Sequence, residues 1–222
     1  MPVAFKRQSH PAPDGAAPSP PRRTRLPPGG TAGNGLLTAA TGVVLFVILG
    51  ALAVTVVAIH PLIDAHLFIG MLLLGPLALK LGSVGYRFGR YRAGVAAYRA
   101  RGLPDAVLAW IAPFVVLSTL LVFASGVVLL LAGPSGRSLW NPVHKFSFAV
   151  WLAVWWGHVV VHLPDLPKLR SEVRARPWDA ASGRGARALS LAAALVLGTV
   201  LAILAIPLFA AWSHFLDPPL HA

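Results

Sequence analysis

The stretch HKFSFAVWLAVWWGHVVVH, residues 144–162, is almost wholly apolar, yet it holds three of the eight histidines in the chain. A run of this length is typical of a helix that crosses a lipid bilayer, which needs about 20 apolar residues. An ionisable side chain inside such a helix is costly and by default marks a functional site. The stretch therefore predicts a membrane-spanning helix whose histidines have a function.

The composition of the whole chain supports this class. Of its 222 residues, 56% are hydrophobic and 12% are charged, whereas soluble domains have about 25% charged residues. The chain has no cysteine, which excludes disulfides, iron–sulfur clusters and thiolate ligands. Histidine is then the residue best suited to bind a transition metal.

Five apolar stretches predict an all-α transmembrane bundle with five spans: residues 36–59, 66–86, 106–132, 142–163 and 188–211. A Pro- and Arg-rich segment, residues 1–35, precedes them and cannot bury enough apolar surface to fold. The predicted organisation is a disordered cytoplasmic tail (1–35), a four-helix bundle (36–163), a basic cytoplasmic loop (164–187), a fifth, accessory transmembrane helix (188–211) and a short extracytoplasmic tail (212–222).

The formal net charge of +12 suggests nucleic acid as one partner, but the layout of the charges favours membrane topology instead. Sixteen of the nineteen basic residues lie in the first tail, in the loop after the second span or in the loop after the fourth. Basic residues accumulate on the cytoplasmic side of membrane proteins. The chain is therefore expected in the plasma membrane, with its N-terminus in the cytoplasm, its C-terminus outside and no nucleic-acid partner.

Two spans carry ionisable groups at the same spacing. His66 and Lys80 are 14 residues apart on the second span, and His144 and His158 are 14 residues apart on the fourth. At 1.5 Å per residue this step moves roughly 21 Å through the membrane and returns to nearly the same helix face. Because the two spans run in the same direction, His66 and His144 are expected at one depth, near the outer side.

A bis-histidine haem needs one imidazole from each of two facing helices, and His66 and His144 meet that condition. Gly70, one turn from His66, and Gly126, on the third span, would each let a flat porphyrin approach a helix closely. The alternative is that these histidines are interfacial residues of a non-redox scaffold or small transporter. His60 and His162 are read as interfacial.

The pattern His66-x3-Gly70, followed by His144, His158 and His162, resembles the small bacterial four-helix membrane cytochromes b. More distantly it resembles the cytochrome b subunits of hydrogenases and formate dehydrogenases. The resemblance covers about residues 62–163. It implies haem b, iron ligation by His66, His144 and His158, and electron transfer with a quinone or an extracytoplasmic redox subunit. The chain would then be an electron-transfer subunit of an oxidoreductase rather than a stand-alone enzyme.

The chain departs from this family pattern at Lys80, which stands where the inner histidine of the second span is expected. Lysine is an uncommon haem ligand, and it is expected instead to extend its amine to the cytoplasmic surface. One haem, held by His66 and His144, is therefore expected, and the second site at His158 lacks a matching histidine. The sequence leaves the oligomeric state open.

Overall fold

The structure is a computed structural model that describes residues 30–100, 106–162 and 183–216. All the secondary structure in these ranges is helical. Most of the predicted tail and of the predicted basic loop lies outside them. The elements in chain order are α1 (Gly30–Val57), α2 (Ile63–Arg92), α3 (Ala96–Arg99), α4 (Ala106–Ala132), η1 (Pro134–Gly136), α5 (Arg137–His162) and α7 (Arg184–Leu216).

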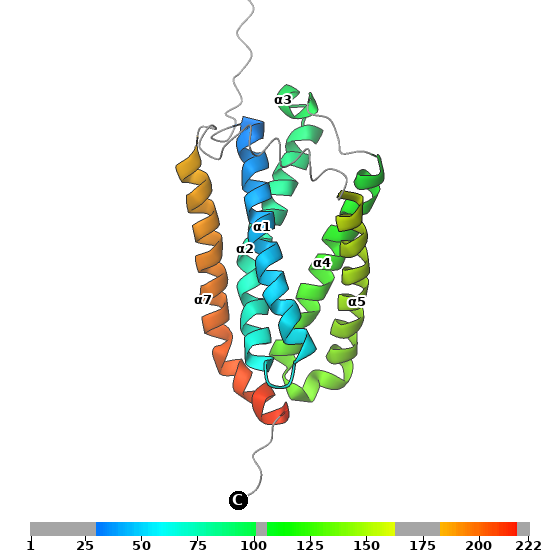
Figure 1. Cartoon of the computed structure of the whole chain (residues 1–222), viewed down its shortest axis with the longest axis vertical. Helices are drawn as coiled ribbons and strands as arrows, with labels where there is room; N and C mark the ends of the chain where they lie inside the picture. Colours follow the sequence, from blue (N-terminus) through cyan, green and yellow to red (C-terminus); the bar gives the residue numbers. More distant parts are fainter. Residues whose placement is uncertain (1–29, 101–105, 163–182, 217–222) are drawn as a thin grey trace, which may run out of the picture.

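The long helices run side by side, up and down (Figure 1). The connections from α1 to α2 and from α4 to α5 lie at one end, called here the turn end, where α7 also finishes; α3 lies at the opposite end. Helix α1 begins at Gly30, earlier than the predicted tail boundary at residue 35. Helix α2 extends to Arg92, past the predicted end at residue 86.

Four helices among the described residues are long and apolar enough to cross a membrane: Gly30–Val57, Ile63–Arg92, Ile111–Ala132 and Arg184–Leu216. They agree with four of the five predicted spans. Helix α5 has a suitable length but is not among the four. Its histidines, lysine and serine and the weakly apolar indoles of its tryptophans lower its hydropathy.

Helix α2 packs tightly against α7. A methyl group added at Gly75 would overlap the backbone carbonyl of Ala194, and one at Gly198 would overlap that of Leu72. Such small residues let membrane helices approach closely, which is a main source of their association. Helix α7 is thus part of the bundle core, which corrects the expectation that it is an accessory helix.

Helices α4 and α5 form a second closely packed unit. Gly133 ends α4 with a φ of 64°, a left-handed conformation that glycine adopts without strain, and η1 leads directly into α5. Between the two helices, the Trp151 indole donates to Thr119 Oγ1 at 3.0 Å. The α4–α5 pair makes far fewer contacts with α1, α2 and α7 than its own two helices make with each other.

Two apolar clusters join the units. At the turn end, Leu130 of α4 packs with Ala205, Phe209 and Trp212 of α7. Further along the bundle, Phe123 of α4 packs against a cluster of α1 and α2 residues, Leu45, Leu73 and Leu77. Neither cluster includes a described residue of α5, and α5 makes few contacts with α1 and α2.

Candidate functional site

His66 lies in the second turn of α2, near the turn end, and is anchored to α1. Its Nδ1 is 2.9 Å from Thr55 Oγ1. The Thr55 hydroxyl donates its single hydrogen to the Leu52 carbonyl at 2.6 Å. Its oxygen must then accept from Nδ1–H, because a carbonyl cannot donate. His66 is therefore held as the Nδ1–H tautomer, with the lone pair on Nε2.

His144, on α5, is anchored to α4 by the same chemistry. Its Nδ1 is 3.1 Å from Ser125 Oγ, which donates to the Val122 carbonyl at 3.0 Å. Ser147 Oγ, one turn along α5, lies 2.8 Å from Ser125 Oγ and completes a hydroxyl pair between the helices. With the Ser125 hydrogen on the Val122 carbonyl, His144 Nδ1–H is the donor to Ser125 Oγ.

The two imidazoles lie close enough to interact electrostatically. The two predicted ligands, one from α2 and one from α5, are thus within electrostatic range of each other. A histidine that binds a metal through one ring nitrogen almost always donates the other N–H to a fixed acceptor, which sets its tautomer and orientation. Both rings have such a hydroxyl beside Nδ1, so Nε2 is in each case the nitrogen that could bind a metal.

The two predicted glycines differ in their surroundings. A Cβ at Gly126 would lie 2.9 Å from His144 Cε1, so the ring rests directly on the α4 backbone. A Cβ at Gly70 would meet no atom within 4 Å. Gly126 is thus needed for the position of His144, whereas Gly70 leaves open space one turn from His66.

Lys80 does not extend to the surface as expected. Its Nζ donates to the Thr38 carbonyl on α1 at 2.7 Å, and it lies 3.0 Å from where a Cβ of Gly42 would be. The missing side chain at Gly42 makes room for the ammonium group. Lys80 is therefore engaged with α1, whereas His158 lies on α5, and Lys80 is not directed as a ligand opposite His158.

The mid-span tryptophans of α5 form an aromatic row. Trp151 stacks with Trp155 at 5.8 Å between ring centroids, and Phe46 of α1 stacks on Trp155 at 6.3 Å. Phe148 extends the row toward His144, 6.0 Å from Trp151. Packing against α1 thus accounts for Trp155, and the hydrogen bond to Thr119 of α4 accounts for Trp151.

The hydroxyl anchors Thr55, Ser125 and Ser147 were not predicted from the sequence. The available signal was their chemistry: small hydroxyl residues inside apolar spans commonly form hydrogen bonds between helices. Ser125 also directly precedes the predicted glycine, Gly126. What the sequence did not contain was the register that pairs each hydroxyl with one imidazole.

Other site types find little support in the described part of the chain. It holds no group of three or more His, Cys, Asp or Glu side chains placed to bind a metal ion. A pocket of about 630 Å³ at the turn end is lined by α2 and α7 residues that include Asp64, Phe68 and Ser213. That pocket does not include His66 or His144. In comparisons with protein families, curated proteins and solved structures, nothing matches this chain.

Proposed function

We propose that this chain is a multi-pass membrane electron-transfer protein that holds one haem b between His66 and His144. The observation that carries the proposal is the matched anchoring of the two rings. Each comes from a different helix, each is fixed through Nδ1 by a hydroxyl group, and the two lie near one another. Paired neutral imidazoles with available Nε2 atoms are suitable axial ligands for haem iron.

The fit of a porphyrin rests on two features of the surrounding helices. Gly70 leaves space beside α2, and Gly126 lets His144 lie flat against α4. Because α4 and α5 contact the other helices lightly, this pair can shift to admit a flat group without disrupting its own packing. When bound, haem would supply one-electron redox chemistry, and the helices would orient it and exclude water.

The proposal includes α5 as a fifth span. It runs alongside α4 (Figure 1), and its polar groups meet partners inside the bundle, as with Ser147 on Ser125 and Trp151 on Thr119. Internal pairing lowers the cost of these groups in a membrane. With five spans and cytoplasmic basic loops, the haem would lie near the outer face of the plasma membrane. A quinone or an extracytoplasmic redox subunit would be the electron partner.

A single haem is proposed, since Lys80 is bonded to the Thr38 carbonyl. His158 then has a role within the helix bundle instead of iron ligation. The competing function is a membrane scaffold or small transporter. The hydrogen bonds of His66 and His144 also suit that function, because they connect α1 to α2 and α4 to α5.

The deciding experiment is a reduced-minus-oxidised visible spectrum of the detergent-purified protein, expressed with ample haem, together with the haem content per chain. One haem per chain is expected, and His66→Ala and His144→Ala should each lose it while still inserting. His60→Ala is the matched control, because His60 is exposed at the same end of the bundle. A protein that carries no haem, or that keeps it in both ligand variants, would leave the scaffold or transporter as the better reading.

A further inference from the structure

Arg90, near the α3 end of α2, has two guanidinium nitrogens that the described residues leave without a hydrogen-bond partner. Its Nε and Nη2 atoms are buried and form no hydrogen bond. Its nearest aromatic contact is the Tyr86 ring, 5.8 Å from Cζ to the centroid. Among the described residues the only acidic one is Asp64, which is bonded to Ser213 at the turn end. Leaving buried guanidinium nitrogens without an anion is costly, and the described residues supply no anion at this end of the bundle.

Two phenols lie beside this group. Tyr98 of α3 is 5% exposed, and its ring meets the Tyr86 ring edge-on, 6.1 Å between centroids. The Tyr98 hydroxyl is buried beside the Tyr86 phenol and has no other hydrogen-bond partner in the described chain. A guanidinium and a phenol together offer several N–H and O–H donors. This is the donor set that binds a phosphate, and arginine is well suited to it.

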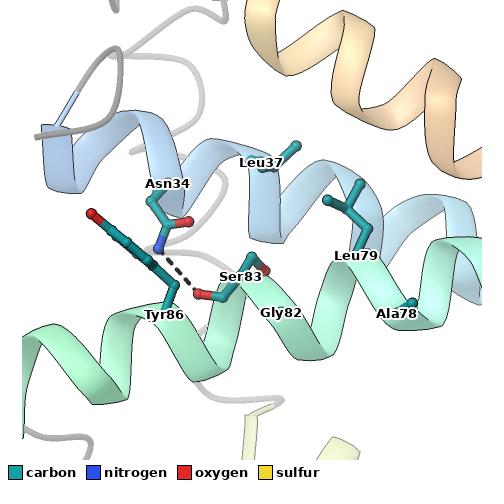
Figure 2. Close-up of a pocket in the computed structure, with 7 residues that line it drawn as sticks. All are labelled: Asn34, Leu37, Ala78, Leu79, Gly82, Ser83 and Tyr86. Carbon is teal, nitrogen blue, oxygen red and sulfur yellow. Dashed lines mark hydrogen bonds between the residues drawn. The ribbon is translucent and has the colours of Figure 1, made fainter.

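An apolar groove adjoins the same tyrosine. A pocket of about 310 Å³ between α1 and α2 is lined by Asn34, Leu37, Ala78, Leu79, Gly82, Ser83 and Tyr86. Figure 2 shows Asn34 and Tyr86 at one end of it and Leu37 and Leu79 toward the other. The Asn34 amide is occupied, since it donates to the Ser83 carbonyl at 3.3 Å. The remaining lining is mainly aliphatic.

We propose that this site binds an anionic phospholipid, with its phosphate at Arg90 and an acyl chain in the groove beside Tyr86. Tyr86 contacts Arg90 and also lines the groove, so the phosphate and an acyl chain of one lipid molecule can bind side by side. The amphipathic character of the site favours a lipid over a free phosphate. The lipid phosphate supplies the negative charge that the described helices do not place beside Arg90. Helices α1 and α2 provide the groove next to Arg90.

The charge half of the proposal has a close control within the same helix. Arg92 has Cζ 5.8 Å from the Phe88 ring centroid, as Arg90 has from Tyr86, but Arg92 is exposed. Full-length protein in mild detergent would be titrated with phosphatidylglycerol and with phosphatidylcholine, and the bound lipid counted by native mass spectrometry. Arg90→Gln should weaken phosphatidylglycerol binding roughly 10- to 100-fold, as expected for a lost hydrogen bond to a charged group.

Arg92→Gln should change phosphatidylglycerol binding by less than about twofold, as expected for an exposed charge. Arg90→Lys keeps the charge without the planar fork and should fall between Arg90→Gln and the parent. Equal losses in Arg90→Gln and Arg92→Gln would overturn the proposal in favour of general surface attraction. Phosphatidylcholine bound as tightly as phosphatidylglycerol would overturn it as well.

The groove half is tested with Gly82→Leu, because an added Cβ there meets no protein atom and Gly82 lines the groove. Gly85→Leu is the control, equally unobstructed but outside the groove. Gly82→Leu should lower phosphatidylglycerol binding at least severalfold, and Gly85→Leu should not. If Gly82→Leu has no effect and millimolar inorganic phosphate displaces the lipid, the site is one for free phosphate and the lipid proposal fails.

Discussion

His66 and His144 each use one ring nitrogen for a hydroxyl group of the neighbouring helix. These hydroxyls donate their own hydrogens to carbonyls of the preceding turn. A local feature of each helix therefore decides the tautomer of an imidazole on another helix. This is a positioning role that a histidine pattern alone does not reveal.

Removing one hydroxyl anchor is expected to weaken the proposed haem site. Ser125→Ala deletes the acceptor for His144 Nδ1–H, and loss of such an outer partner typically lowers metal affinity about 10- to 100-fold. Transfer of haem to a scavenger protein would measure the loss. Ser118→Ala is the matched control on α4, because Ser118 is also buried but bonds only to the Val115 carbonyl of its own helix. Equal effects of the two variants would argue against anchoring.

Tyr98 gives a prediction about alkaline pH. Burial raises the pKa of its phenol, and the Tyr86 phenol adds to the rise, while Arg90 opposes it. The folded protein then keeps the Tyr98 proton where the unfolded chain, with a pKa of about 10, has lost it. The contribution to stability is present below that pH and is lost as the pH rises through the folded-state pKa.

A spectrophotometric titration of tyrosinate checks this expectation. Tyr98→Phe should remove a component that titrates above the ordinary tyrosine range, and Arg90→Gln should move that component to still higher pH, since Arg90 favours the phenolate. A shift to lower pH in Arg90→Gln would contradict the proximity of the two groups.

At the level of elements, the crossing of α2 and α7 depends on the absence of two side chains. Gly75→Ala would force its methyl group against the Ala194 carbonyl, and overpacking of this kind costs about 1–3 kcal/mol. Thermal denaturation of the detergent-solubilised protein should show a lower midpoint. Gly85→Ala, on the same helix with open space around it, should leave the midpoint unchanged or raise it. A harmless Gly75→Ala would show that the helices do not cross so closely.

At the scale of the whole molecule, the number of membrane crossings can be measured by finding the side of the membrane on which exposed residues lie. The chain has no cysteine, so single cysteines can be placed without background at Ala97 in α3, Ser135 in η1 and Ala186 in α7, all exposed. If α5 crosses the membrane, Ala97→Cys and Ala186→Cys share the cytoplasmic side. A membrane-impermeant maleimide on intact cells should then label only Ser135→Cys. Labelling of Ala186→Cys along with Ser135→Cys would mean that α5 does not cross.

Much of this arrangement was predictable from the sequence, because apolar length identifies helices and charge alternation limits their directions. The proximity of His66 and His144 is predicted from the depth and direction of their spans, and it stays a prediction that the haem measurement tests. The role of α7 was not predictable, because the contact of Gly75 with Ala194 depends on a register between distant segments. The bond from Lys80 to Thr38 was hidden for the same reason.

The light contact between the α4–α5 pair and the other three long helices has a consequence for assembly. Apolar side chains gain little by leaving lipid for one another, so membrane helices associate mainly through close packing and hydrogen bonds. The α4–α5 pair has close packing and hydrogen bonds of its own, and so does the group formed by α1, α2 and α7. A haem ligated from both groups would add a strong link across the seam between them. Cofactor insertion would then complete the tertiary structure, and a chain without the cofactor would consist of two loosely joined groups of helices.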